Sequence, residues 1–372
     1  MDSQQTLMDR PRGRLAVKAH LAWMLALLAG VCSFLVFDAA QRDFSYDYYG
    51  YLHYFDRLAD LSWNDFCASV RSQLPLPFVE IPPQGQFEVG FAALCWFALN
   101  NGLSSATTYA IVCATSIAIR IGLWQASRVP IHIMVLTAIY SITLFEANAA
   151  RVGCAITVTI GFVFALARGH RWLALGLAIL AALFHLQSLA MSVPFFLLWI
   201  TFTWISHSRG TRLLLAVGVF LLSIFSAFSL SFFTFAKLES YSDVATTAGG
   251  FTIVSMLAAT SLLSGALLFV RGHANFANIA NYKLWSCVLM SCYPALFALL
   301  IATQTGAVGD RLWQFAFVLL ASVPPNFRKY DWFVKIYLLS FGLCLIVSVV
   351  NVTVRYPLSN FFAPLLPYAY PL

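Results

Sequence analysis

QGQFEVGFAALCWFALN, residues 84–100, places a single acidic residue inside an otherwise apolar run. That residue, Glu88, lies two positions before Gly90 and close to two phenylalanines. An ionised carboxylate at the boundary of an apolar medium is costly unless water or a cation receives it. The position of Glu88 therefore depends on whether this run crosses a membrane.

The whole chain is strongly apolar. Of its 372 residues, 60% are hydrophobic and only 10% are charged. Soluble proteins of this length carry far more polar surface, so the composition excludes a soluble globular protein. Apolar runs of about 20 residues recur along the chain, and each is long enough to cross ~30 Å of hydrocarbon. We therefore predict an all-α, polytopic integral membrane protein, because the alternating pattern of a transmembrane β-barrel does not occur.

The N-terminal segment MDSQQTLMDRPRGRLAVKAH (residues 1–20) is basic, like the start of a signal peptide. The apolar run that follows, at about residues 19–38, is too long for the core of such a peptide and has no clear small-x-small cleavage site. We therefore expect a retained first transmembrane helix. The net charge of +7 belongs to the topology signal described next and does not indicate nucleic-acid binding.

About eleven apolar runs are expected to form transmembrane helices. They lie at about residues 19–38, 103–124, 130–146, 152–167, 172–190, 191–206, 211–233, 250–270, 284–302, 311–323 and 333–353. Basic residues gather in alternate connections, namely Arg10, Arg12, Arg14, Lys18, Arg128, Arg168, Arg171, Arg209, Arg212, Arg271, Lys283, Arg328 and Lys329. Because cytoplasmic loops carry the excess of lysine and arginine, these connections and the N-terminus are predicted to lie inside.

This topology requires that residues 87–101 do not cross the membrane, since a crossing there would turn every basic connection outward. We predict a re-entrant or surface-lying helix on the outer side, with Glu88 at the outer face. By the same count Glu146 also lies at the outer face. The chain then forms a single membrane domain, with a cytoplasmic N-terminus (1–18), an outer loop with interfacial and re-entrant helices (39–101), a transmembrane bundle (102–353) and an outer tail (354–372).

The first outer loop is rich in tyrosine. It begins QRDFSYDYYGYLHYFDRLADLSWNDF (residues 41–66), where Tyr51, Phe55, Leu58 and Leu61 recur near helical spacing. This spacing predicts an amphipathic helix at the membrane interface. Its tyrosines suit either an aromatic interface belt or a platform for sugar rings. The following LPLPFVEIPPQGQ (residues 74–86) predicts an extended, turn-rich approach to the re-entrant helix.

Four ionisable residues are predicted at outer or outer-half depth, and each also has a structural explanation. Glu88 can cap its helix, and Arg151 can extend from its span to the interface. His185, about two thirds of the way along its predicted span, can be a buried structural histidine. Arg311 follows Asp310 and can be neutralised by it. Because all four fall at one depth, we favour a shared polar site.

Five short motifs follow one another along the chain. They are Arg42, Asp47, Tyr51 and Phe55; Phe87, Glu88, Gly90 and Phe91 in FEVGF; Asn148, Arg151 and Ala155; His185 in LFHLQSLAMSVPF; and Gly309, Arg311 and Leu312. Their order resembles the EpsG-like branch of the polysaccharide polymerases, which is related to the O-antigen (Wzy-type) polymerases. Val89, Val152 and Gln187 depart from that pattern, in which proline, glutamine and serine are usual.

The resemblance implies an enzyme that joins oligosaccharide repeat units carried on polyprenyl diphosphate, at the outer face of the bacterial cytoplasmic (inner) membrane. A hydroxyl of one unit attacks the anomeric carbon of the other chain, and polyprenyl diphosphate leaves. The implied partners are the lipid-linked oligosaccharide, the lipid bilayer and other polysaccharide export or chain-length proteins, but no nucleic acid.

The leaving diphosphate needs cations, and arginine forks bind phosphate oxygens bidentately. Arg151 and Arg311 are expected to bind it, with Arg42 and Arg355 as further candidates. The expected substrate-binding residues also include Tyr51 and Asn148.

The acceptor hydroxyl needs a base close to its oxygen. Glu88 is the favoured catalytic base, with His185 and Asp47 as alternatives. Gly90 is expected to leave room for a sugar to approach the backbone.

No cofactor is expected, and no compact set of oxygen ligands indicates a metal site. The eight scattered cysteines form no CxxC pair and predict small buried hydrophobes. Two other functions stay open. A flippase or other transporter of lipid-linked oligosaccharide would show an internal repeat, which the sequence lacks. A membrane acyltransferase with His185 as its base would draw its acyl donor from the cytoplasm, where the connections are short and basic.

Overall fold

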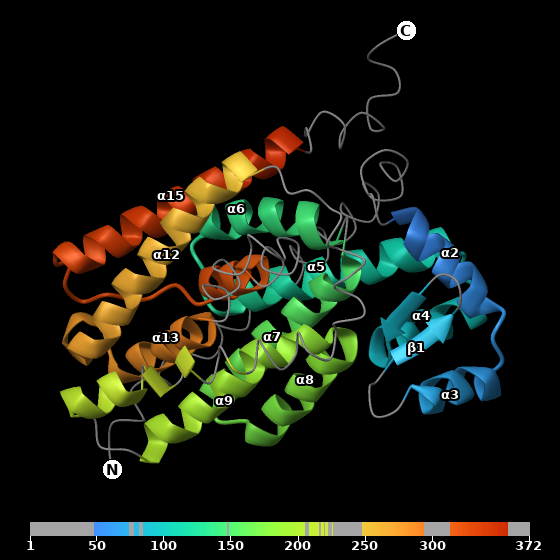
Figure 1. Ribbon diagram of the computed structural model, residues 1–372, viewed down its shortest axis with the longest axis horizontal. Helices are drawn as coiled ribbons and strands as arrows, with labels where there is room; N and C mark the ends of the chain where they lie inside the picture. The colour runs from blue at the N-terminus through green and yellow to red at the C-terminus, as the bar shows by residue number, and fades with distance from the viewer. Residues whose placement is uncertain are drawn as a thin grey trace, which may run out of the picture.

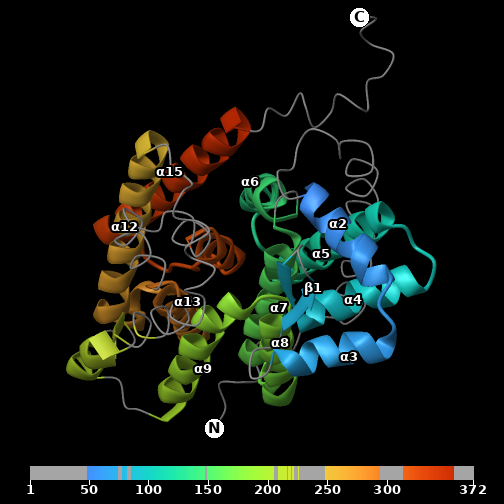
Figure 2. The ribbon, with the colours of Figure 1, turned by 45° about the vertical axis from the view of Figure 1, so that its right-hand side comes forward.

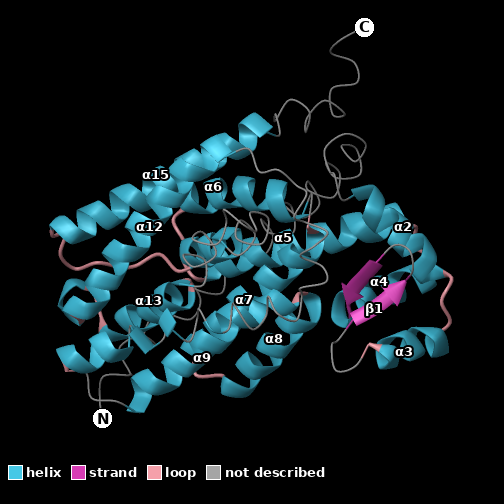
Figure 3. Cartoon of the chain, in the orientation of Figure 1, coloured by secondary structure: helices cyan, strands magenta, loops and turns pink. Residues whose placement is uncertain are grey.

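The computed structural model describes residues 48–73, 78–81, 85–146, 149–204, 208–215, 217–218, 220–221, 225, 248–293 and 313–355. Within these ranges the chain is helical apart from one short hairpin, which confirms the all-α class predicted from composition (Figure 3). The predicted first span at 19–38 lies outside the described residues, as do parts of the spans predicted at 191–206, 211–233, 284–302 and 311–323.

The N-terminal part of the described chain forms a compact unit of short elements. It consists of α2 (Tyr48–Ala59), α3 (Trp63–Ser72), β1 (Phe78–Ile81), β2 (Gly85–Glu88) and α4 (Val89–Asn100). The strands pair antiparallel, with Phe78 opposite Glu88 and Ile81 opposite Gly85. The extended approach predicted for residues 74–86 is therefore a β-hairpin in part, an element that the sequence analysis did not predict.

Longer helices follow and form the bundle. They are α5 (Ser105–Ala126), α6 (Ile131–Ser141) with a π-helix (Ile142–Glu146), α7 (Ala150–Ala167), α8 (Arg171–Phe184), a 3₁₀ turn (Leu186–Ser188), α9 (Leu189–Trp204), α12 (Ala248–Arg271), a 3₁₀ turn (His273–Asn275), α13 (Ile279–Ser291) and α15 (Trp332–Arg355). In Figures 1 and 2 the α2–α4 unit lies at one end of the molecule and α12, α13 and α15 at the other, with α5 and α7 between.

Three helices of the described chain, α5, α7 and α15, are long and apolar enough to cross a membrane. The predicted number of about eleven spans stays a prediction. Helix α4 has 12 residues, so it is only about 18 Å long, which is less than the ~30 Å of a hydrocarbon core. Its length therefore agrees with a segment that does not cross.

The predicted amphipathic helix exists, but its apolar face is buried in the protein. The rings of Tyr51 and Tyr54 in α2 pack on Phe87, with centroids 5.1 and 3.8 Å apart. The Tyr54 hydroxyl donates to the carbonyl of Val79 in β1 at 3.1 Å. Tyr48, Tyr51 and Tyr54 are thus core residues, and neither an exposed aromatic belt nor an exposed sugar platform describes them.

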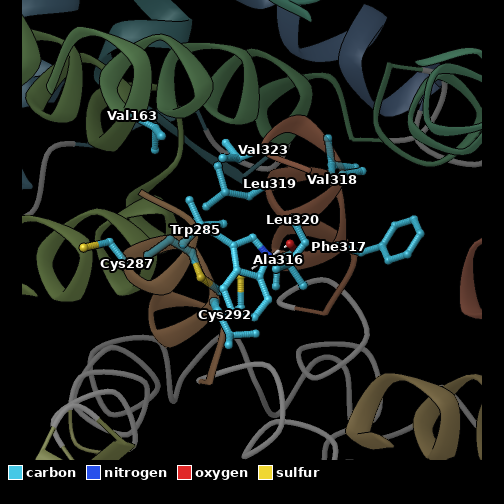
Figure 4. Packing of buried hydrophobic residues seen from close by; sticks show 14 of the residues in the cluster. Val163, Trp285, Cys287, Cys292, Ala316, Phe317, Val318, Leu319, Leu320 and Val323 are labelled. Atoms are coloured by element: carbon cyan, nitrogen blue, oxygen red, sulfur yellow. Dashed lines mark hydrogen bonds between the residues drawn. The ribbon is translucent and has the colours of Figure 1, made fainter. Parts of the chain in front are cut away.

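Two hydrophobic cores hold the structure together. One lies between the α2–α4 unit and α5, and it reaches Ala150 and Cys154 of α7. The other fills the bundle, where Trp285 and Cys292 pack close to Leu319 and Leu320 (Figure 4). The two cores meet at partly buried side chains that pack on both of them, namely Ile121 and Phe184. Phe184 immediately precedes His185, so the predicted polar residues lie close to this junction.

The span predicted at 172–190 is broken in the structure. Helix α8 ends at Phe184, and His185 has extended backbone angles (φ −160°, ψ 111°) before the 3₁₀ turn that leads into α9. A discontinuous helix exposes backbone polar groups, which a membrane protein tolerates only where protein or a water-filled cavity receives them. His185 therefore lies at a helix break and not within a continuous span.

Candidate functional site

Glu88 connects strand β2 to helix α4. It is the N-cap residue of α4, with extended backbone angles (φ −63°, ψ 140°), but its side chain makes no capping hydrogen bond. The carboxylate instead binds two side chains from other helices, Arg151 of α7 and His185 at the end of α8. Glu88 therefore caps α4 by position only, and its side chain makes its contacts elsewhere.

Arg151 lies in the first turn of α7 and points into the protein. Its Nη1 donates to Oε2 of Glu88 at 2.6 Å, and its guanidinium lies 4.5 Å from the centroid of the Phe87 ring. The side chain is only 13% exposed, so the guanidinium is directed toward protein groups. Its Nε is buried and has no hydrogen-bond partner among the described residues.

His185 completes the cluster. Its Nδ1 lies 2.9 Å from Oε1 of Glu88, and its Nε2 lies 3.1 Å from the amide oxygen of Gln187. A neutral ring that donates from Nδ1 accepts at Nε2, which requires the Gln187 amide to turn and present its NH₂ group. The pair has the form of a carboxylate that fixes the tautomer and orientation of an imidazole.

Opposing effects set the ionisation of Glu88. Burial acts to raise its pKa, but the positive charge of Arg151 and the contact with His185 outweigh burial and hold the pKa well below the ordinary value. Glu88 is thus a stable carboxylate at neutral pH. A carboxylate with a low pKa is a weak proton acceptor, because base strength falls with the pKa of the conjugate acid.

Gly90 is required by helix packing. A Cβ atom at this position would lie 2.7 Å from Cβ of Leu183 and 2.9 Å from its carbonyl oxygen. The backbone of α4 therefore approaches α8 as closely as a glycine allows. The expected space for a sugar beside Gly90 is occupied by α8, which corrects that expectation.

A second buried ion pair lies deeper in the bundle. Nη2 of Arg120, in α5, donates to Oε1 of Glu146 at 2.5 Å, and both side chains are at most 1% exposed. Arg120 Nε also donates to Thr157 at 3.0 Å, and Ser116 donates to Glu146 at 3.2 Å. Glu146 ends the π-helix and is fully buried, so its carboxylate binds Arg120 inside the protein, and its position at the outer face stays a prediction.

This second pair fixes the beginning of α7. Arg120 Nη2 donates to the carbonyl of Gly153 at 2.7 Å, two residues after Arg151. The Tyr109 hydroxyl donates to the backbone carbonyl of Glu146 at 2.6 Å. A Cβ atom at Gly153 would lie 2.5 Å from the Glu146 carboxylate. The two ion pairs are therefore connected through the first turns of α7.

The other predicted site residues are placed as follows. Tyr51 is buried in the aromatic cluster beside Phe87 and Phe91. Arg355 is the last residue of α15. Four of them lie outside the described residues, namely Arg42, Asp47, Asn148 and Arg311. No group of three or more His, Cys, Asp or Glu side chains that could hold a metal ion occurs in the described part of the chain.

Arg120 was missed in the sequence analysis, although a signal for it exists. It is the only charged residue of the apolar run SIAIRIGLW (residues 116–124). An ionisable residue within a membrane span needs a buried partner. The nearest acidic residue at the end of the following span is Glu146, so the pair could have been proposed from this rule.

The chain is a helical membrane protein with a polar site in its interior. Its apolar helices enclose a glutamate, an arginine and a histidine, and the histidine lies at a helix break. A model of the EpsG family matches residues 25–370, and the chain belongs to this family. Membership indicates a role in polysaccharide biosynthesis. Comparison with curated proteins and with solved structures gives no match.

Proposed function

We propose that the protein is a polysaccharide polymerase that joins oligosaccharide repeat units carried on polyprenyl diphosphate. The reaction takes place at the outer face of the bacterial cytoplasmic membrane and releases polyprenyl diphosphate. The observation that supports it most is the Glu88–Arg151–His185 cluster. It combines an anion-binding group, a proton acceptor and a fixed carboxylate within a chain of the EpsG family.

Arg151 is proposed to bind the leaving diphosphate. Glu88 accepts from only one nitrogen of the Arg151 guanidinium, Nη1. The buried Nε of Arg151 is an additional donor without a described partner. A phosphate oxygen that accepts from Nε satisfies this donor and brings negative charge to a cation already positioned by the protein. Arg311 is proposed as a second cation for the same group, with Arg42 and Arg355 as weaker candidates and Asn148 as a polar neighbour.

His185 is proposed as the base, and this changes the order of the three candidates. The low pKa of Glu88 makes it a poor proton acceptor. Its contact with Nδ1 instead leaves Nε2 of His185 free to accept a proton once Gln187 gives way to the substrate. Glu88 then acts as a positioning residue that also stabilises the imidazolium. Asp47 stays an alternative base.

The proposed step balances as follows. The acceptor hydroxyl loses its proton to Nε2 of His185, and its oxygen forms a bond to the anomeric carbon of the donor chain. The bond from that carbon to the diphosphate oxygen breaks, and polyprenyl diphosphate leaves with the electron pair. Positive charge from Arg151 is placed where negative charge develops, which lowers the barrier.

Lipid-linked intermediates of a deletion strain test this function. A strain without the polymerase should hold single repeat units on the carrier at the outer face. Units that face inward would instead identify a transporter, and polymer of normal length without acyl groups would identify an acyltransferase. Purified protein supplied with lipid-linked repeat units should then lengthen them, and failure to do so in a folded preparation would contradict the proposal.

A further inference from the structure

A groove on the surface of the bundle lies toward the opposite ends of α7 and α8 from Arg151 and His185. Its cavity of about 390 Å³ lies between α8 and α9 and reaches the end of α7. Most of its lining is apolar or aromatic, with Leu166, Trp172, Phe196 and Trp199 among the contributors. Such a lining suits a hydrocarbon chain, because burying apolar surface is favourable and demands no directed partner.

Two cationic side chains lie at or next to this groove. Arg171, the first residue of α8, is one of the lining residues. Lys283 of α13 does not itself line the groove, but its Nζ lies 4.5 Å from the centroid of the ring of Trp199, which does. Among the described residues, neither cation forms an ion pair with a carboxylate. Arg120, Arg151 and Arg271, by contrast, each form one.

The two positive charges lie close enough to affect one another. Burial lowers the pKa of Lys283, Cys287 acts in the opposite direction, and the positive charge of Arg171 adds to the lowering. Two like charges held together without an anion between them repel each other, so a negative group placed there is attracted by both. The arrangement is thus complementary in charge to a phosphate and complementary in polarity to an acyl chain.

We propose that this groove binds an anionic phospholipid, with its phosphate between Arg171 and Lys283 and an acyl chain along Trp172, Phe196 and Trp199. Exposed apolar side chains continue from the groove along α8, where Trp172 is 86% and Ile179 53% exposed, so a lipid can enter from the bilayer. Basic pockets between membrane helices recognise anionic headgroups in this way. On the proposed topology both cations lie on the cytoplasmic side, where phospholipid and not the outer-face substrate is available.

This site is independent of the polymerase reaction. It contains none of the residues of the Glu88 cluster and is defined by its own groove and charges. An occupied groove also joins α8 to α13 through one headgroup, and α8 ends at His185. Lipid selectivity alone tests this binding site, and its result does not depend on whether the proposed function is correct.

The test is native mass spectrometry of the full-length protein in detergent. The probes are dioleoyl phosphatidylglycerol, dioleoyl phosphatidylcholine, inorganic phosphate and glycerophosphoglycerol, which is the same anionic headgroup without acyl chains. Wild type should retain phosphatidylglycerol in preference to phosphatidylcholine. Arg171→Gln and Lys283→Gln should each lower the retention of phosphatidylglycerol by roughly fivefold, while phosphatidylcholine is unchanged.

Arg168→Gln is the matched control, because Arg168 is an exposed arginine of the same turn that does not line the groove. It should retain phosphatidylglycerol like wild type. Equal loss in Arg168→Gln, or no preference in wild type, would overturn the proposal. Displacement of the lipid by phosphate or glycerophosphoglycerol at equal concentration would also overturn it, since the groove would then be a simple anion site. The thermal midpoint of each variant shows whether it is folded.

Discussion

Two buried arginine–glutamate pairs lie in the same molecule and differ in how completely their hydrogen bonds are satisfied. In Arg120–Glu146 each guanidinium nitrogen has a protein partner, with Thr157 and Gly153 completing the set. In Arg151–Glu88 the Nε of Arg151 has none among the described residues, and the carboxylate also holds a histidine. A saturated pair has nothing left for a ligand, whereas the unsaturated pair keeps a donor that a substrate can use.

The difference predicts that the first pair serves folding and the second serves function. Both arginines are held by α7, Arg151 as a residue of its first turn and Arg120 through the Gly153 carbonyl. A change to the saturated pair should therefore disturb the unsaturated one through α7, while the reverse effect should be smaller.

The largest effect is expected from breaking the saturated pair. Arg120→Met or Glu146→Leu leaves one charge buried without its partner, which costs roughly 3–5 kcal/mol. Each single variant should fail to accumulate in membranes, as measured by the amount and thermal midpoint of purified protein. The double variant Arg120→Met/Glu146→Leu removes both charges and should recover much of the stability. A stable single variant would show that the pair is not structural.

A smaller loss of stability and a large loss of activity are expected from Arg151→Lys. Lysine keeps the charge beside Glu88 but lacks the planar fork and the Nε donor, so it cannot bind a phosphate in the same way. Polymerisation of lipid-linked repeat units should fall on the order of a hundredfold, with accumulation close to wild type. Arg57→Lys and Arg71→Lys, at exposed arginines of α2 and α3, are controls and should polymerise normally. Equal activity in Arg151→Lys would remove Arg151 from the site.

The identity of the base is tested by His185→Gln and Glu88→Gln. Removal of a general base costs on the order of a hundredfold in rate, and we expect that loss in His185→Gln. Glu88→Gln keeps an acceptor oxygen for Nδ1 of the histidine and should lose less rate per folded molecule. If Glu88→Gln loses more than His185→Gln, Glu88 is the base and the present assignment is wrong.

Glu88 should also contribute to the pH dependence of stability. Its pKa is depressed in the folded protein, so an unfolded chain takes up this proton first as the pH falls. The contribution of Glu88 is therefore present above the ordinary carboxyl pKa of about 4.3 and is lost as the pH falls below it. The thermal midpoint of wild type should drop between about pH 5 and pH 3 by more than that of Glu88→Gln. Parallel curves would contradict the ion pair.

Much of the architecture could be predicted because it depends on composition and length. Apolar runs fixed the helical class, and a run of 12 residues is too short to cross a bilayer. The order of the motifs also indicated a shared site for Glu88, Arg151 and His185. These residues lie up to 97 positions apart in sequence, and Glu88 is within hydrogen-bonding distance of the other two.

Features that depend on local geometry could not be predicted in the same way. The helix break at His185 has no glycine or proline at the break itself, so no breaker signal marks it. Counting spans places Glu146 at the end of a helix but does not tell which way its side chain turns. The π-helix that precedes α7 changes this direction and carries the carboxylate into the bundle.

The smallest expected effect separates packing from ligand binding at Gly90. An alanine Cβ would lie 2.7 Å from Leu183, so α4 has to move away from α8 and carry Glu88 away from His185. Overpacking of this kind costs about 1–3 kcal/mol, and the thermal midpoint of Gly90→Ala should fall by several degrees. Gly50→Ala in α2 is the matched control, because nothing lies within 4 Å of its added Cβ. That change should be neutral or stabilising by up to about 1 kcal/mol, since alanine is the better helix former. If the two variants are equally stable, the close approach of α4 to α8 is not what holds Glu88 beside His185.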